Sequence, residues 1–427
     1  MNCLNTPRLI APLAGSALAL STLALSTAAA LLTSTAHGGG EACRQAAAAQ
    51  AAAQDTTQTA AQPAVQQQQK PVQNIDLAIC LDTSGSMQGL IDSARARIWD
   101  VVSDLARATP APKLRVALLT YGNDGYNAEN GWTKVDIDLS DDLDTVSKQL
   151  FALTTNGGTE LVARAVDRAT RELTWTPGET LKIILVAGNE SADQDQTIHY
   201  QDASKRAIEK GILVNSIYCG NSSDQLVAAW KEVARLADGR SACIDQSSAQ
   251  VNVDTPYDQE ILAANATLNT TYLPYGAQGA EGCGNQTLQD TNARNMSGAT
   301  LTGRAVAKCS GNYWNAHWDL VDACKDPAFK LEEMEAKDLP ESMRVLKKEE
   351  RRAFVAERAK QREEIQNKIK ELDAKRAQFI ATALAARPAG PDSFDRALRE
   401  AIRAQATARG LQFADPAAVA AGPQTGR

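Results

Sequence analysis

The chain has 427 residues, of which 44% are hydrophobic and only 5% aromatic, which is enough for two or three domains with a sizeable core. Its formal net charge of -7 is mildly acidic, and no basic block dominates the sequence. We therefore expect no nucleic-acid partner.

The N-terminus has the pattern of a signal peptide over residues 1–36. Arg8 is the only charged residue before a long apolar run over 9–33, and the small residues Ser34-Thr35-Ala36 follow it. This pattern predicts export to the periplasm, the cell envelope or the medium. The alternative is an uncleaved membrane anchor, because the run is long enough to span a bilayer.

An Ala- and Gln-rich stretch over residues 37–73 lacks the bulky apolar residues of a core, and we expect a disordered linker there. Strand and helix patterns then alternate over residues 74–246. Strands are predicted at 75–81, 114–121, 135–139, 181–186, 212–219 and 241–244, with helices at 90–105, 143–150, 161–173, 198–210 and 226–237. The alternation predicts an α/β fold, a doubly wound, mostly parallel sheet with helices on both faces.

The rest of the chain is predicted to be helical or irregular. Residues 247–325 form a cysteine-containing extension that packs on the first domain or is tied to it by disulfides. Residues 326–386 are charged and helix-forming, with a partly coiled-coil stripe interrupted by arginines, and 387–427 hold a short helix, capped by Asp392 or Ser393, and a loose tail. The stripe comprises Val355, Ile365, Ile369, Leu372 and Phe379, and the arginines are Arg358, Arg362 and Arg376.

Eight cysteines occur, and an even set of them in an exported chain suggests disulfides. Cys3 lies in the targeting segment and Cys80 is expected to be a buried thiol in a strand. The remaining six are Cys43, Cys219, Cys243, Cys283, Cys309 and Cys324. We favour the pair Cys219–Cys243, because these residues end two strands that could be neighbours. The chain has no C-x-x-C pair, which argues against a zinc or redox motif.

One motif has the residue types of a metal-binding site. Asp82-Thr83-Ser84-Gly85-Ser86 stands where the first buried strand ends and the first helix begins, at the sheet edge where such folds bind ligands. A second polar loop, residues 154–160, precedes another helix and contains Gly157-Gly158-Thr159-Glu160. Carboxylate and hydroxyl oxygens suit hard cations such as Mg²⁺, Mn²⁺ or Ca²⁺. The alternative is that Ser84 and Ser86 only cap the helix.

These two loops resemble the metal-ion-dependent adhesion site of von Willebrand factor type A domains, and the resemblance covers about residues 74–246. It implies a doubly wound fold with the site at the carboxyl edge of the sheet. It also implies metal ligation by Asp82, Ser84, Ser86 and Thr159.

The sequence departs from the family at one ligand position. The family usually has Asp-Gly after the fourth buried strand, whereas this chain has Ala187-Gly188-Asn189-Glu190. In this stretch the chain resembles a subset of exported bacterial proteins of the family. We expect Glu190 to replace the missing ligand, directly or through water. Asp193 is a second candidate, and a surface position for Glu190 is the alternative.

The predicted function is a binding module of the cell envelope that uses Mg²⁺ or Mn²⁺ to engage an acidic residue of a protein partner. We expect no enzymatic activity. The C-terminal helix offers an arm for self-association. One alternative is a metal-free scaffold that acts through this arm. The other is a metal-dependent hydrolase, for which the sequence shows no second carboxylate cluster or basic clamp.

Overall fold

The computed structural model describes residues 71–244, 253–385 and 394–413. At its centre is a six-stranded sheet in the order β4-β3-β1-β5-β6-β7, in which β4 runs antiparallel to β3 and the other pairs are parallel. The strands are β1 (Asn74–Asp82), β3 (Lys113–Tyr121), β4 (Thr133–Ser140), β5 (Thr180–Gly188), β6 (Ile212–Cys219) and β7 (Ser241–Ile244). The predicted fold class is confirmed.

Helices cover both faces of this sheet because its central strands are apolar on both sides. In β1, Leu77 and Ile79 face one core and Ala78 and Cys80 face the other. The first core contains α2 (Gln88–Ala106), α3 (Leu143–Ala152) and α12 (Phe394–Ala408), and the second contains α4 (Val162–Glu172), α5 (Tyr200–Glu209) and α6 (Val227–Arg235). Cys80 is a buried free thiol, as predicted.

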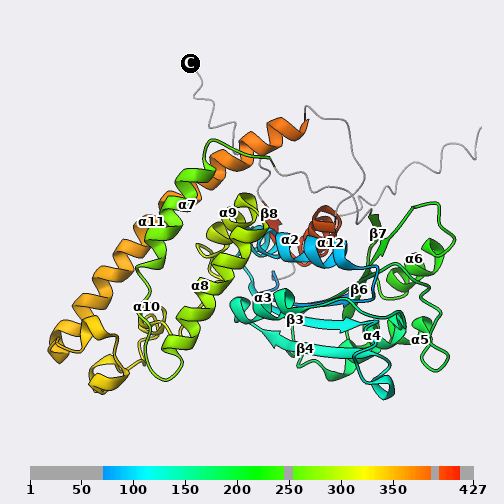
Figure 1. Cartoon of the computed structure of the whole chain (residues 1–427), viewed down its shortest axis with the longest axis horizontal. Coiled ribbons are helices and arrows are strands. Elements are labelled where there is room, and N and C mark those ends of the chain that lie inside the picture. Colours follow the sequence, from blue (N-terminus) through cyan, green and yellow to red (C-terminus); the bar gives the residue numbers. More distant parts are fainter. Residues whose placement is uncertain (1–70, 245–252, 386–393, 414–427) are drawn as a thin grey trace, which may run out of the picture. The chain divides into compact units, whose positions relative to one another are not determined.

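The C-terminal helix packs into the first core although it lies far from that core in the sequence. Leu398 and Ile402 of α12 are buried together with residues of α2, and Figure 1 shows the two helices side by side. A two-stranded sheet, β2 (Ala108–Thr109) with β8 (Gln412–Phe413), also joins the end of α2 to the chain that follows α12. The predicted caps Asp392 and Ser393 lie outside the described residues, as do residues 1–70.

A helical region follows the sheet. It consists of α7 (Asp258–Asn269), α8 (Gly279–Met296), α9 (Gly298–Ala307), α10 (Leu320–Ala323) and α11 (Lys348–Ala385). Short 3-10 turns are η1 (Ala128–Asn130), η2 (Leu331–Glu333), η3 (Ala336–Asp338) and η4 (Glu341–Met343). The long helix α11 lies along α7 (Figure 1), and its residues Ile369 and Leu372 share a core with α7 and α9. Within the described ranges, no helix is long and apolar enough to cross a bilayer.

The cysteine prediction is wrong for the residues that the structure describes. Cys219, Cys283, Cys309 and Cys324 are free thiols, and Cys43 lies outside the described ranges. The favoured pair fails because of register: Cys243 lies opposite Tyr218, whereas Cys219 lies opposite Ile244. Since side chains alternate along a strand, this one-residue offset places the two thiols on opposite faces of the sheet.

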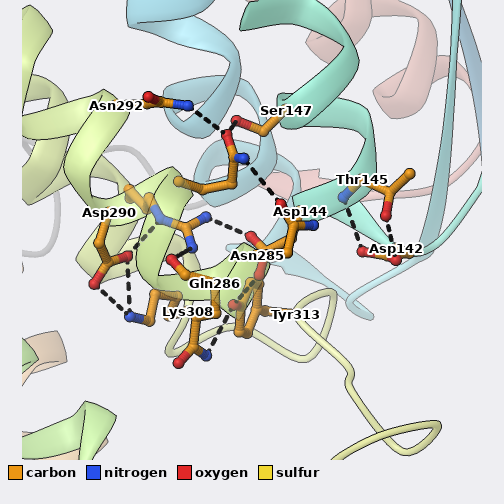
Figure 2. A network of polar contacts seen from close by, with 12 residues as sticks. Asp142, Asp144, Thr145, Ser147, Asn285, Gln286, Asp290, Asn292, Lys308 and Tyr313 are labelled. Atoms are coloured by element: carbon orange, nitrogen blue, oxygen red, sulfur yellow. Dashed lines mark hydrogen bonds and ion pairs between the residues drawn. The ribbon is translucent and has the colours of Figure 1, made fainter. Parts of the chain in front are cut away.

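Buried ion pairs connect the helical region to the sheet domain. Arg304 of α9 is fully buried, and its guanidinium donates to Asp144 of α3 and to Asp290 of α8, each at 2.6 Å. Tyr313 donates its hydroxyl to the other oxygen of Asp144, also at 2.6 Å. Figure 2 shows Asp144, Asp290, Lys308 and Tyr313 around this cluster. The guanidinium also lies over the Trp99 ring, 4.6 Å from its centroid.

Arg362, one of the arginines that interrupt the predicted stripe of α11, forms a buried ion pair inside the helical region, as Arg304 does between the two regions. Arg362 is buried and pairs with Asp319 at 2.7 Å, and it donates to the carbonyl oxygen of Thr271 at 2.9 Å. The predicted interruption of the stripe is therefore a buried ion pair, by which α11 is held to the segment before α10. Phe379, at the other end of the stripe, is exposed.

We predict that Arg304→Met destabilises the protein by about 3–5 kcal/mol, because it leaves the carboxylate of Asp144 buried without a cation. Urea denaturation measures the change. The matched control is Arg235→Met, which breaks the exposed Arg235–Glu232 pair and should leave the urea midpoint unchanged. Equal midpoints for both variants would contradict the prediction.

Candidate metal centre

The first turn of the site follows from the end of β1. Asp82 is the last residue of the central strand, and Thr83 is anchored by a hydrogen bond from its N–H to the carbonyl of Tyr121 at 2.8 Å. The Ser84 N–H donates to Asp82 Oδ1 at 2.7 Å. The hydroxyl oxygens of Ser84 and Ser86 lie 3.4 Å apart. Asp82, Ser84 and Ser86 therefore face one small region above the strand.

The second turn lies directly against the first. The Gly85 N–H donates to the carbonyl of Gly157 at 3.0 Å, and the Asn156 N–H donates to the carbonyl of Thr83 at 3.0 Å. Gly157 has a φ of +85°, and a Cβ at this position would collide with Asp124. The two turns predicted from sequence thus meet at one edge of the sheet. Thr159 follows in the second turn, where it is half-buried.

Asp82 carries a buried oxygen that lacks a partner. The residue is fully buried, and among the described residues none forms a hydrogen bond with its Oδ2. Burial raises the pKa of Asp82 to about 7 against the opposing hydrogen bonds from Ser84, and the charges of Glu160 and Glu190 raise it further. A cation beside Oδ2 would supply the missing interaction and favour the ionised carboxylate.

Space near this oxygen is kept by glycines. A Cβ on Gly188 would lie 3.0 Å from Asp82 Oδ2, and one on Gly122 would lie 2.7 Å from Oδ1 and 2.9 Å from Glu160 Cγ. Gly122 also has a φ of +79°, which side chains rarely adopt. A side chain at either position would therefore collide with the carboxylate of Asp82 or with its neighbours.

Ala187 cannot contribute a ligand. It is fully buried in the first core, next to Leu81 in register, and its carbonyl accepts a hydrogen bond from the Tyr121 hydroxyl at 2.9 Å. Glu160 brings a carboxylate to this edge of the sheet: it is buried, and its charge raises the pKa of Asp82. Gln194 donates to Glu160 Oε2 at 3.4 Å.

Glu190 lies at the same edge. Its carbonyl accepts a hydrogen bond from the indole of Trp230 at 2.8 Å, and its side chain is half-buried. Burial raises the pKa of Glu190, and the charges of Glu160 and Asp224 raise it further. Asp193, the second candidate, is exposed.

Sequence reasoning did not select Glu160 or Asn189. Glu160 follows Thr159 directly, and this adjacency could have suggested it once the aspartate at position 187 was found to be absent. Asn189 donates its amide to the Ser86 hydroxyl at 3.1 Å, while its buried Oδ1 has no hydrogen-bond partner among the described residues. A carboxamide beside the serine pair is a further oxygen donor for a hard cation.

The donor set is mixed and does not consist of carboxylates alone. Within the described part of the chain, no group of three or more His, Cys, Asp or Glu side chains is placed to hold a metal ion. An ion at this edge would therefore depend on the hydroxyls of Ser84, Ser86 and Thr159 beside Asp82. Oxygen donors of this kind fit Mg²⁺, Mn²⁺ or Ca²⁺.

The comparison with family models matches residues 76–242 to the von Willebrand factor type A domain. The chain contains a von Willebrand factor type A (VWA) domain. The match covers the sheet from β1 into β7 and both turns of the site, and it leaves out the helical region. No curated protein matches the sequence.

The solved structures that are similar to the chain include the following three. Proximal thread matrix protein 1 from the mussel byssus, solved with a zinc-occupied MIDAS motif, is 13% identical over 40% of this chain and 42% of its own, with a TM-score of 0.33. A von Willebrand factor type A protein from Catenulispora acidiphila is 17% identical over 42% of this chain and 40% of its own, with a TM-score of 0.33. The pilus adhesin SpaC from Lactobacillus rhamnosus is 14% identical over 49% of this chain and 33% of its own, with a TM-score of 0.32.

The raised pKa of Asp82 predicts a pH dependence of the metal-free protein. The carboxyl is easier to ionise in the unfolded chain, with an ordinary pKa near 3.8, than in the fold, where it is about 7. Its contribution to the free energy of unfolding is therefore complete below pH 4 and is lost as the pH rises toward 7. In EDTA, we therefore expect the difference in the free energy of unfolding between Asp82→Asn and wild type to favour the variant by about 2 kcal/mol more at pH 8 than at pH 5.

Urea midpoints of wild type and Asp82→Asn at the two pH values measure this difference. Asp193→Asn, a substitution of an exposed carboxylate, is the matched control and should follow wild type. If the stabilities of wild type and Asp82→Asn change equally between the two pH values, the pKa of Asp82 is not raised in the fold, and the prediction is wrong.

Proposed function

We propose that the VWA domain holds a divalent cation, Mg²⁺ or Mn²⁺, through Asp82, Ser84, Ser86 and Thr159, and uses it to bind an acidic residue of a protein partner. The observation that carries the proposal is the buried Asp82 Oδ2, which no described group satisfies. A bound cation would supply an open coordination position for an oxygen of the partner.

Glu160 and Glu190 are the proposed substitutes for the aspartate that Ala187 replaces. Both charges act on Asp82, and Glu160 is the more deeply buried of the two. Losing one charged ligand weakens a divalent site unless another carboxylate compensates for it. We propose that Glu160 compensates for the missing charge beside Asp82 and that Glu190 does so from the rim, through water.

The loops around the site indicate the chemistry of the partner surface. The segments 83–87, 122–132, 153–161, 188–199 and 220–226 contain no Lys or Arg. Their exposed rim carries Asp124, Glu129, Asp193 and Asp224. Because this rim is acidic, the residue that reaches the cation should be surrounded by basic residues on the partner. The same lack of a cationic clamp disfavours phosphoester hydrolysis.

The proposed location is the cell envelope or the exterior, and it depends on the signal-peptide pattern in residues 1–36, outside the described ranges. Self-association through α11 is a further part of the proposal. The alternative of a free helical arm is less favoured, because one flank of α11 packs on α7 and α12 packs on α2.

We predict that Mg²⁺ or Mn²⁺ raises the melting temperature of wild type by several degrees, because a ligand that binds only the folded state stabilises it. Asp82→Ala should abolish the rise and Glu160→Gln should weaken it. A thermal shift titration measures both effects. The control Asp193→Asn should keep the full rise.

Glu190→Gln tests which of the two carboxylates, Glu160 or Glu190, compensates for the missing aspartate. A normal metal response in this variant with a reduced one in Glu160→Gln would assign the compensating carboxylate to Glu160. An equal melting temperature with and without metal in wild type would refute the metal-binding proposal.

A further inference from the structure

Three helices bring a lysine, an asparagine and an aspartate together in the helical region, away from the metal centre. Asn269 ends α7, Asp290 lies in α8 and Lys308 follows the last residue of α9. Lys308 and Asp290 are buried, whereas Asn269 is half-buried. Tyr272, Cys309 and Trp318 belong to the apolar cluster formed by the same helices.

The three polar groups are in direct contact with one another. Lys308 Nζ lies 2.5 Å from Asn269 Oδ1 and 3.1 Å from Asp290 Oδ2, and Figure 2 shows the contact of Lys308 with Asp290. The Asn269 amide nitrogen donates to the same Asp290 oxygen at 2.8 Å. Because a C=O bond is about 1.23 Å long, the Lys308 nitrogen is at most about 3.7 Å from Asn269 Cγ.

This arrangement joins a nucleophile, an electrophile and a proton carrier in one buried site. Burial lowers the pKa of Lys308, and the Arg304 charge lowers it further against the attraction of Asp290. A larger fraction of this amine is therefore neutral and nucleophilic than for an exposed lysine. A carboxylate that touches both nitrogens can take a proton from one and give it to the other.

We propose that Lys308 and Asn269 form an intramolecular isopeptide bond, with Asp290 as the group that moves the proton. The neutral Lys308 nitrogen attacks Asn269 Cγ, and a C–N bond forms. Asp290 removes a proton from the attacking nitrogen and delivers it to Asn269 Nδ2. The Cγ–Nδ2 bond then breaks and ammonia leaves on the half-exposed side of Asn269. No oxidant, reductant or cofactor is needed, and Asp290 is regenerated.

The neighbouring charges make this reaction slow. Burial acts to raise the pKa of Asp290, but the charges of Lys308 and Arg304 outweigh it and lower the pKa, so Asp290 is a weak base. The bond is therefore expected to accumulate after folding and to reach completion on prolonged incubation of the purified protein. It would tie the end of α7 to the end of α9 covalently.

Peptide mapping by tandem mass spectrometry of the incubated full-length protein tests the proposal. We expect a branched tryptic peptide that joins Lys308 to Asn269 and is lighter by about 17 Da, the mass of ammonia, than the two peptides together. Trypsin should no longer cut after Lys308. A folded wild-type protein that is cut after Lys308 and yields only linear peptides would overturn the proposal.

Variants test the role of each group. Asn269→Ala and Lys308→Arg should give no branched peptide. Asn265→Ala is the matched control, because Asn265 also donates to Asp290 Oδ2, at 3.1 Å, but supplies neither reacting atom. It should keep the branched peptide. Asp290→Asn should lose it while circular dichroism still shows a helical fold, and an undiminished yield in this variant would refute the proton transfer by Asp290.

Discussion

A single buried oxygen, Asp82 Oδ2, sets the constraint on which the proposed site depends. The central strand of the sheet ends in a fully buried carboxylate, and no donor among the described residues reaches its Oδ2. A buried ionised carboxylate is costly unless a cation or several donors compensate for it. The chain instead adds the charges of Glu160 and Glu190 nearby, which increases the cost. This concentration of negative charge is what a divalent cation would relieve.

The helical region contributes to the position of the site through α3. That helix ends at Ala152, and the second turn of the site follows it directly. Asp144 near the start of α3 is bound by Arg304 and Tyr313 from the helical region. The C-terminal helix α12 also packs on α2, which begins just after the first turn. Both turns of the site are thus attached to helices that the rest of the chain supports, although the VWA match itself ends at residue 242.

The sequence was sufficient for the parts of the fold that repeat a local pattern. The apolar run of β1 and the three-to-four spacing of α2 predicted both elements, and the positions of Ser84 and Ser86 at their junction followed from them. Contacts between distant segments could not be predicted in this way. The register that separates Cys219 from Cys243 depends on one residue of offset between β6 and β7. Likewise, Arg362 interrupts an apolar stripe in the sequence. Its ion pair could not be predicted, because its partner Asp319 is 43 residues away.

The most direct measurement is an anomalous difference map from crystals of the protein grown with Mn²⁺. We expect one peak at the carboxyl edge of the sheet, in contact with Asp82 and the hydroxyls of Ser84 and Ser86. A map without a peak there, with the two serines bonded only to the start of α2, would contradict it.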